Sequence, residues 1–416
     1  MKTNFELKLD YIRQHINENN SYQTGNFYDY RLSTAFQPIY SLAHKRHIGF
    51  EALVRVKDTA SQRIGPANLF QRNKSPGDHI FLDRLCRCIH LNNFSFLKDD
   101  INWLFLNVSP ETIIQGKAYG AYFKDLIDHA GFPAHRIVIE VVESPIEDNE
   151  LLMETINYYK HLGCLIAIDD FGAGHSNFNR IWTLKPDIVK LDRSFLIKAA
   201  TQKNIQDILP GIVSLLHQAG ALVLMEGIET ENEAMVAIES NVDFVQGFYF
   251  GMPFTELHPG FDRFQDFERL FDLAKTRFLA YENKFREKID QYNSKFKQVA
   301  GFLRQGLPLS EASSCLFDEL DIVRCYQIGV NGIQIGKTIL SKKYACRQSQ
   351  RFKPLEDANS ADWFRRHYLR RAIFHPEQLQ VTRPYLSITG AHMCVTLSMK
   401  FSGRQGDSVI CCDLAV

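Results

Sequence analysis

Short apolar runs recur between residues 48 and 245, and a polar side chain follows each of them. The runs and the residues that follow them are 48–50 with Glu51, 104–106 with Asn107, 137–139 with Glu140, 166–168 with Asp169 and Asp170, 188–189 with Lys190, 222–225 with Glu226, and 244–245 with Gln246. About 20 to 50 residues separate most neighbouring runs, which is enough for a helix and two loops. The pattern predicts a repeated unit of strand, polar end and helix.

Strands buried on both faces read as continuous Val, Ile and Leu runs, and repeated strand–helix units form a parallel sheet. A further run at 35–40 brings the number of expected strands to eight. Eight units in roughly 240 residues fit an α/β fold of the TIM-like (β/α)8 barrel type, whose active site lies at the carboxyl ends of the strands. A doubly wound open sheet is the alternative, but its site would gather around one switch point.

The strand–helix pattern stops near residue 253, and a chain of 416 residues is too long for a single average domain. Apolar residues three or four apart between 264 and 305 predict one long amphipathic helix, which either packs against a neighbouring domain or forms a dimerising or signal-transmitting helix. We expect four parts, namely a helical N-terminal extension at 1–29, the barrel at 30–258, the connecting helix at 264–305, and a small α+β domain at 307–416.

Composition narrows the possible partners. The chain has 48 lysine and arginine residues and 48 aspartate and glutamate residues, so its formal net charge is zero. We therefore expect no nucleic-acid polymer as a partner, and any anionic ligand must be held locally. Residues 1–20 contain no apolar leader segment and no run of 18 uncharged apolar residues occurs, which predicts a soluble cytoplasmic protein without a membrane span. Nine cysteines without a secretory signal predict reduced thiols.

The polar strand ends point to metal-dependent chemistry. Four carboxylates and one amide at a single barrel mouth disfavour ionisation unless cations sit there. Mg²⁺ or Mn²⁺ prefers such oxygen ligands, whereas a zinc cage would need a His or Cys cluster. Two ions about 3.5 to 4 Å apart form the clamp used for in-line phosphoryl displacement. Neighbouring strand residues point to opposite faces, so Asp169 and Asp170 need a special backbone, which we expect from the turn at 171–174.

The motif Glu51-Ala52-Leu53 followed by Arg55 resembles the signature of the EAL domain, the cyclic di-GMP phosphodiesterase family. Six further motifs resemble those of the family in the same order, and together they cover about residues 30 to 255. They are Leu106-Asn107-Val108-Ser109, Ile139-Glu140-Val141-Val142-Glu143-Ser144, Asp169-Asp170-Phe171-Gly172-Ala173-Gly174, Val189-Lys190-Leu191-Asp192, Glu226-Gly227-Ile228-Glu229-Thr230 and Val245-Gln246-Gly247.

The resemblance implies a TIM-like barrel that cleaves cyclic di-GMP to linear pGpG with two Mg²⁺ or Mn²⁺ ions. It also assigns roles to single residues. Glu51, Asn107, Glu140, Asp169, Asp170 and Glu226 match metal ligands, Lys190 matches the residue that positions the attacking water, Leu53, Arg55 and Gln246 match substrate contacts, and Glu229 matches the acid that braces the loop after Asp170. That loop is also implicated in dimerisation, so a homodimer is expected. The sequence departs from the family at His175, where the family usually has tyrosine.

The C-terminal part resembles a PAS- or Cache-type sensor more weakly, over residues 307–416. Short β-like runs occur at 322–328, 334–340, 394–401 and 409–414, and an unknown small ligand or protein partner is expected to bind there. Arg365, Arg366 and Arg383 either line an anion pocket or pair on the surface. The resulting hypothesis is a metal-dependent cyclic di-GMP phosphodiesterase that this sensor regulates. The alternative is a slow or inactive cyclic di-GMP receptor that signals through the connecting helix.

Overall fold

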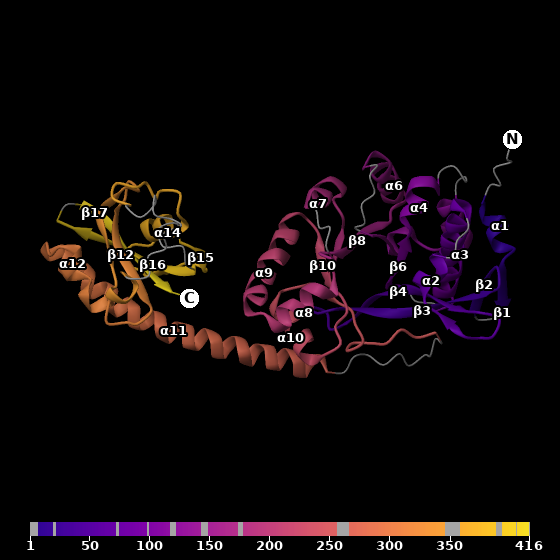
Figure 1. Cartoon of the computed structure of the whole chain (residues 1–416), viewed down its shortest axis with the longest axis horizontal. Helices are drawn as coiled ribbons and strands as arrows, with labels where there is room; N and C mark the ends of the chain where they lie inside the picture. The colour runs from indigo at the N-terminus through magenta and orange to yellow at the C-terminus, as the bar shows by residue number, and fades with distance from the viewer. Residues whose placement is uncertain are drawn as a thin grey trace. The chain divides into compact units, whose positions relative to one another are not determined.

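The computed structural model describes residues 7–19, 22–71, 75–97, 100–116, 122–142, 149–173, 178–255, 266–345, 358–387, 393–404 and 406–415. The chain divides into two compact units, residues 1–275 and 276–416. We call them the barrel unit and the C-terminal unit, and each is described by itself. Figure 1 shows the helices and strands of both units.

The barrel unit is built on a closed sheet. Among the described residues, eight strands form the ring in the order β3-β11-β10-β9-β8-β7-β6-β4, and β4 returns to pair with β3. The strands are β3 (Tyr30–Ser41), β4 (Arg46–Lys57), β6 (Trp103–Val108), β7 (Ile137–Val142), β8 (Leu165–Phe171), β9 (Ile188–Leu191), β10 (Leu222–Met225) and β11 (Phe244–Val245). Each contains one of the predicted apolar runs, so the structure confirms the TIM-like barrel.

The first barrel strand runs against the others. β3 pairs antiparallel with both β4 and β11. All other neighbouring strands of the ring pair in parallel, in the order β4, β6, β7, β8, β9, β10 and β11. Only the turn at 42–45 separates β3 from β4. A parallel connection needs a crossover of a dozen or more residues, so this link can only form a hairpin. The rule of strand, polar end and helix therefore holds from β4 onward but not for β3.

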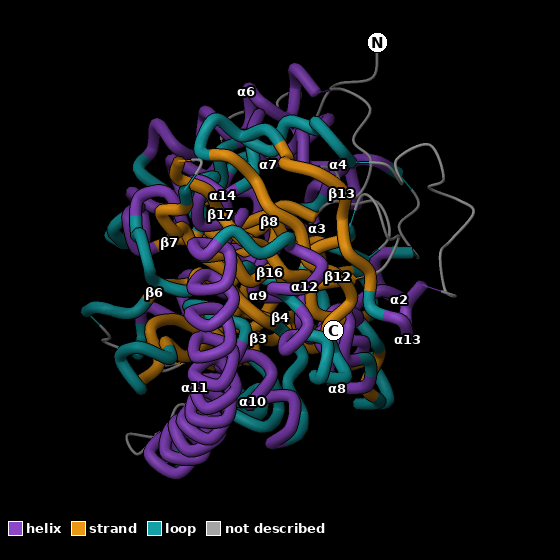
Figure 2. The backbone as a smooth tube through the Cα atoms, turned by 90° about the vertical axis from the view of Figure 1, so that its left-hand side faces the viewer, coloured by secondary structure: helices purple, strands orange, loops and turns teal. Residues whose placement is uncertain are grey.

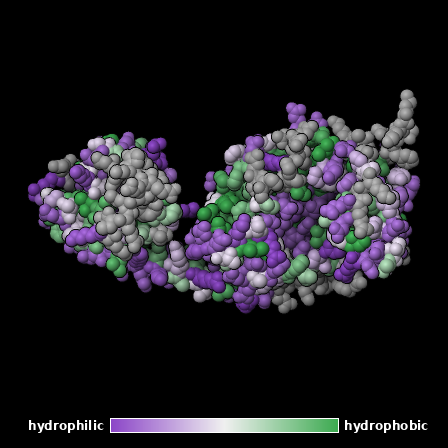
Figure 3. All heavy atoms as spheres, in the orientation of Figure 1, coloured by the Kyte–Doolittle hydropathy of each residue, from purple (hydrophilic) through white to green (hydrophobic). Residues whose placement is uncertain are grey.

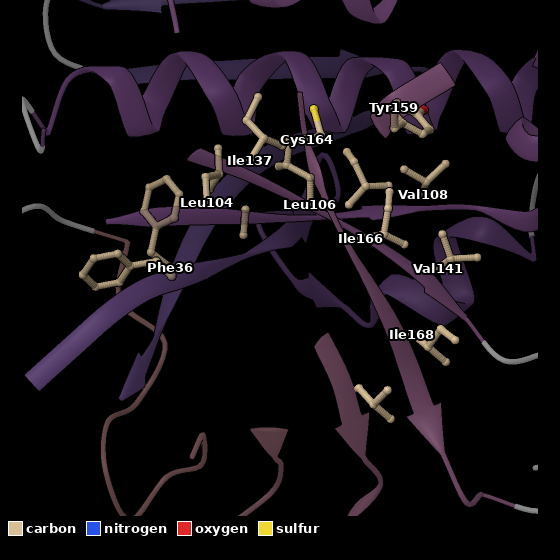
Figure 4. Packing of buried hydrophobic residues seen from close by; sticks show 14 of the residues in the cluster. Phe36, Leu104, Leu106, Val108, Ile137, Val141, Tyr159, Cys164, Ile166 and Ile168 are labelled. Atoms are coloured by element: carbon tan, nitrogen blue, oxygen red, sulfur yellow. The ribbon is translucent and has the colours of Figure 1, made fainter. Parts of the chain in front are cut away.

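Helices cover the outside of the ring, with α3, α4, α6, α9 and α10 labelled around it in Figure 1. The barrel-unit helices that follow β5 (Arg63–Ile64) are α2 (Pro66–Phe70), α3 (Pro76–Ser95), α4 (Pro110–Gln115), α5 (Phe123–Ala130), α6 (Asn149–Leu162), α7 (Phe178–Leu184), α8 (Arg193–Thr201), α9 (Lys203–Gln218) and α10 (Glu231–Glu239). Outward-facing strand residues such as Leu104, Leu106, Ile166 and Ile168 pack in the main core, part of which Figure 4 shows.

The N-terminal extension differs from the prediction. We expected it to be helical over residues 1–29, but its described part has a single short helix, α1 (Leu9–Arg13), followed by β1 (Ile16–Asn19) and β2 (Tyr22–Phe27). β2 pairs antiparallel with β3 and so extends the barrel sheet beyond the ring. The β2 sequence contains Tyr, Thr, Gly, Asn and Phe, all of which are weak helix formers, so the available sheet edge determines its conformation.

The predicted connecting helix is observed as α11 (Phe267–Gln305), which Figure 2 shows as one uninterrupted helix. Hydrophilic side chains cover much of the face of the molecule that Figure 3 shows, with small hydrophobic areas between them. Among the helices that the structure describes, none combines the length and the apolar character that a membrane crossing requires.

The C-terminal unit is a small α+β fold. Its sheet has the order β13-β12-β17-β16-β14, and β15 also pairs with β16. The strands are β12 (Ile322–Gly329), β13 (Gln334–Leu340), β14 (Gln380–Val381), β15 (Tyr385–Leu386), β16 (Met393–Gly403) and β17 (Gly406–Ala415), and the short helices are α12 (Leu309–Ala312), α13 (Lys342–Ala345) and α14 (His367–Phe374). All four predicted β-like runs lie in strands. The PAS- or Cache-like identity stays a prediction.

The C-terminal sheet has an apolar cluster on each face. Cys412 packs in one cluster with Tyr292 and Phe296 of α11, whereas its neighbour Cys411 packs in the other with Leu369 of α14. Successive strand residues point to opposite faces, so α11 and α14 lie on opposite faces of this sheet.

Candidate active site

The barrel interior has an apolar layer, and the polar strand ends form the next layer above it. The apolar layer contains Phe105, Val138, Ala167, Ile188, Leu224 and Phe244, together with Ile39. Two residues further along each strand lie Asn107, Glu140, Asp169, Lys190, Glu226 and Gln246. Because side chains alternate between the two faces of a strand, residues two apart point the same way. The alternation therefore turns all six polar side chains into the barrel mouth.

The sequence reasoning missed Gln37, which the reversed strand supplies. Ile39 of β3 belongs to the apolar layer. Because β3 runs antiparallel to its neighbours, the residue of β3 in the polar layer lies two positions before Ile39, and it is Gln37. Gln37 lies opposite Glu51 in the β3–β4 ladder, and both residues are buried. The sequence signal that could have identified it is a single glutamine inside the otherwise apolar run at 35–40.

Lys190 lies at the centre of the mouth and is fully buried. Its Nζ atom is 2.5 Å from Glu140 Oε1, 2.6 Å from Glu226 Oε1 and 3.0 Å from Asp169 Oδ1, and it is 3.7 Å from Glu51 Oε2. The predicted carboxylates from four different strands therefore converge on one ammonium group.

Two amides hold the carboxylate of Glu51. Asn107 Nδ2 donates to Glu51 Oε1 at 3.1 Å, and Gln246 Nε2 donates to Glu51 Oε2 at 2.8 Å. The predicted substrate contact Gln246 is itself buried and lies next to Glu51. Glu51 thus has a fixed orientation towards the centre of the mouth.

A β-bulge brings Asp169 and Asp170 to the same site. The register of β8 against β9 shifts between Ile168 and Phe171, and Asp170 has a left-handed backbone with φ of 57°. The special backbone that we expected from the turn at 171–174 therefore lies inside β8. An extra residue in one strand re-aims its neighbours, and here it directs two successive carboxylates to one side. Carboxylate oxygens of Asp169, Asp170 and Glu226 lie within 4.8 Å of one another.

The mouth holds more negative charge than Lys190 neutralises. Burial, followed by the neighbouring Glu51, raises the pKa of Glu140 well above its usual range. Burial raises the pKa of Glu226 to about 8 against the opposing effect of Lys190, and burial followed by Asp169 raises the pKa of Asp170. Burial alone lowers the pKa of Lys190, but the surrounding carboxylates, Asp169 foremost, raise it well above its usual value. Five carboxylates thus face one ammonium group.

The donor set fits divalent cations with a preference for oxygen ligands. Glu140 is fully buried, and its Oε2 atom lacks a hydrogen-bond partner among the described residues. A buried carboxylate oxygen in that position needs a cation or a donor. The clustered oxygens of Asp169, Asp170 and Glu226 provide the hard ligands that Mg²⁺ and Mn²⁺ favour.

The predicted substrate contacts Leu53 and Arg55 line a cavity of about 550 Å³ together with the mouth residue Asn107. Arg55 is half-buried, and burial followed by Arg63 lowers the pKa of its guanidinium group. The polar α3 residues Asp83 and His90 also line this cavity. Sequence reasoning missed both, although polar residues at 83, 87 and 90 recur at helical spacing within an apolar helix. A second cavity of about 400 Å³, lined by residues of α3, α4 and α6, lacks the mouth residues.

Among the described residues, Glu229 is connected to the loop after Asp170 through α8. Its carboxylate pairs with Arg193, the first residue of α8. Phe195 of the same helix contacts Gly172, where φ is +103° and an added Cβ would overlap the Phe195 ring. The loop-bracing role of Glu229 stays a prediction, and the divergent residue His175 lies outside the described residues.

Curated relatives share part of this chain. YkuI of Bacillus subtilis, described as an EAL-domain containing protein, is 28% identical over 273 residues, which cover 63% of this chain and 63% of YkuI. The cyclic di-GMP phosphodiesterase NbdA of Pseudomonas aeruginosa is 26% identical over 234 residues, which cover 54% of this chain and 29% of NbdA. The sequence alignments therefore cover less than two thirds of the length of either relative.

The fold is similar to that of a solved structure. The crystal structure of Bacillus subtilis YkuI, with an EAL domain, in complex with substrate c-di-GMP and calcium, superposes with a TM-score of 0.73 at 22% identity. The similarity covers 92% of this chain and 96% of that chain, so it extends over both units. The model of the EAL domain matches residues 24–253, which is more than half of the sequence, and the chain therefore belongs to the EAL domain family.

Proposed function

We propose that this protein is a metal-dependent phosphodiesterase that hydrolyses cyclic di-GMP to linear pGpG. The observation that carries the proposal is the convergence of Glu51, Glu140, Asp169 and Glu226 on Lys190 at the barrel mouth. The relative NbdA is a cyclic di-GMP phosphodiesterase, and YkuI has been solved with this dinucleotide and calcium. Both facts support the assignment of the same substrate to this chain.

The carboxylates at the mouth would hold two Mg²⁺ or Mn²⁺ ions, with Asn107 completing the set of oxygen ligands. Such ions, when bound, supply a more acidic water molecule and positive charge for the phosphodiester oxygens. Lys190 donates hydrogen bonds from a fixed ammonium group and orients the attacking water between the carboxylates. Arg55 and Leu53 lie in the adjoining cavity, where a guanidinium group can bind phosphate and an apolar side chain can contact a guanine ring.

Purified protein incubated with cyclic di-GMP and Mg²⁺ or Mn²⁺ is expected to release pGpG, which chromatography separates from the substrate. Asp169→Asn should reduce turnover at least about 100-fold, because the negative charge of a metal ligand is lost while the shape of the side chain is kept. The exposed Asp125→Asn on α5 is the matched control and should keep full activity. Unchanged activity in Asp169→Asn would refute the role assigned to that residue.

A receptor that binds cyclic di-GMP without cleaving it is the alternative. Single-turnover cleavage in Mn²⁺, compared with binding in Ca²⁺, separates the two. Binding without any pGpG over many half-lives of the complex would favour the receptor.

The remaining parts of the proposal concern assembly and regulation. We infer a cytoplasmic homodimer in which the C-terminal unit acts as a PAS- or Cache-like sensor that controls the barrel. Sedimentation of the full chain would measure the oligomeric state. Deletion of residues 307–416 should change the turnover rate if the unit is regulatory.

A further inference from the structure

The C-terminal unit contains a basic cavity that the hydrolysis of cyclic di-GMP does not use. Its volume is about 430 Å³. Side chains from α14 and from the segment around β14 and β15 line it, and the residues that matter here are Arg366, His367, Arg371, Thr382, Arg383 and Tyr385. Three guanidinium groups therefore border a space large enough for a small organic molecule.

Aromatic rings hold Arg366 in place. Its guanidinium carbon lies 5.9 Å from the centroid of Trp363 and 5.7 Å from that of Tyr385, and Arg366 is half-buried. Stacking on two rings restricts the rotamers of the side chain while its N–H groups keep their donor capacity. Less conformational entropy is then lost when the group binds an anion.

Among the residues that the structure describes, the arginines at this cavity have no carboxylate partner. Within the described part of the unit, no carboxylate lies within 4.0 Å of the guanidinium groups of Arg366, Arg371 or Arg383. By contrast, the buried Arg324 pairs with Asp413, with its Nε atom 2.6 Å from Asp413 Oδ2. The buried arginine is thus paired with an acid, whereas the three arginines at the cavity have no such partner in the described ranges of the unit.

The charge of the whole unit points the same way. Residues 276–416 contain 21 lysine and arginine residues against 13 aspartate and glutamate residues, whereas residues 1–275 contain 27 against 35. The net charge of zero therefore conceals a C-terminal unit of +8 and a barrel unit of −8. A positive unit raises the local concentration of anions around its cavity.

Tyr385 forms one side of the cavity, and its hydroxyl group already has a hydrogen-bond partner. The Tyr385 hydroxyl is 2.6 Å from Thr396 Oγ1, which donates to Asp413 Oδ1 at 2.7 Å. This hydrogen-bond chain fixes the Tyr385 ring at one side of the cavity.

We propose that this cavity binds a small molecule with two or more phosphate or carboxylate groups. Arg366, Arg371 and Arg383 bind the anionic oxygens in bidentate fashion, and Tyr385 contacts the body of the ligand. The cavity lies at α14 on one face of the sheet, and α11 packs on the other. The inference deepens the proposed sensory role, and only the effect of binding on turnover rests on the proposed function. Binding itself is independent of cyclic di-GMP cleavage.

The test uses the full chain without cyclic di-GMP and titrates it calorimetrically with pyrophosphate, citrate and acetate at constant ionic strength. We expect one pyrophosphate or citrate per chain, with acetate at least about tenfold weaker because it offers a single anionic group. Preference for pyrophosphate identifies a phosphorylated ligand and preference for citrate a polycarboxylate, and both support the proposal. Trp363 fluorescence reports the same event, since Arg366 stacks on its ring.

Arg383→Gln and Arg371→Gln, both at exposed positions, should each weaken binding at least about tenfold through the loss of charge-assisted hydrogen bonds. Arg286→Gln on the exposed face of α11 removes the same charge outside the cavity and should change affinity less than about twofold. If neither pyrophosphate nor citrate binds at a concentration of about 10 mM, the proposal is overturned. Equal losses in Arg383→Gln and Arg286→Gln would overturn it as well, because they indicate diffuse attraction without a site.

Discussion

Replacement of Lys190 by methionine tests the electrostatic account of the barrel mouth. Methionine has a similar length but no charge, so Glu140, Asp169 and Glu226 lose the ammonium group that lies 2.5 to 3.0 Å from them. In a chelator such as EDTA, no divalent cation takes its place. We expect the barrel to lose stability under these conditions and to lose its activity under all conditions.

The magnitude follows from burial and distance. Two unit charges 4 Å apart interact by about 4 kcal/mol at an effective dielectric constant of about 20, and removal of one partner of a buried ion pair costs about 3–5 kcal/mol. A loss of about 4 kcal/mol in the free energy of unfolding is an upper value, because the uncompensated acids can take up protons. Divalent cations at 100 times their dissociation constant add about 2.7 kcal/mol to any form that binds them. The variant should bind them more tightly than wild type, because its carboxylates lack the competing ammonium group. The difference between variant and wild type should therefore narrow in Mg²⁺.

Urea unfolding followed by tryptophan fluorescence measures the effect. A Trp363→Phe background leaves Trp103 and Trp182, both in the barrel unit, as reporters. Lys198→Met, at an exposed position on α8, is the matched control and should shift the midpoint little. Equal stability of Lys190→Met and wild type in EDTA would refute the reasoning, as would a difference that Mg²⁺ leaves unchanged.

Two further predictions concern the barrel. Burial, followed by Arg55, lowers the pKa of His90 to about 3, so the folded state keeps this ring neutral while the unfolded state protonates below pH 6.5. The contribution of the neutral His90 ring to the free energy of unfolding is therefore complete above pH 6.5 and decreases as the pH is lowered. At pH 5 about 2 kcal/mol of it is lost. The urea midpoint of His90→Asn should therefore depend less on pH than that of wild type. Gly172→Ala should destabilise the barrel by at least about 2 kcal/mol, because φ is +103° and the new methyl group overlaps Phe195. Phe195→Ala in the same chain should recover part of that loss if the overlap is the cause, and no recovery would assign the loss to the backbone alone.

The sequence predicted the ring and most of the mouth because one physical rule governs both. A buried parallel strand appears in the sequence as an apolar run. Because side chains alternate along a strand, the polar residue after the run points to the same side of the sheet as the residue two positions before it. The sequence alone therefore places Lys190 after 188–189 and Gln246 after 244–245 in the mouth.

Other features depend on tertiary context that the local pattern does not contain. The direction of β3 is decided by the short turn at 42–45, and the bulge at Asp170 by the register of β8 against β9. Asp83 and His90 face the cavity beside the mouth because α3 lies against the barrel, which helical spacing alone does not reveal. The N-terminal strands form because a free sheet edge was available beside β3.

The opposite charges of the two units have a consequence for the behaviour of the protein in solution. The neutral molecule contains one unit of net charge +8 and one of net charge −8, and either unit can attract the opposite unit of another molecule. The attraction is strongest in dilute buffer and fades once the screening length falls to about 10 Å near 0.1 M salt. The protein should therefore precipitate on dialysis into water, redissolve on addition of salt, and adhere to both anion- and cation-exchange resins at neutral pH.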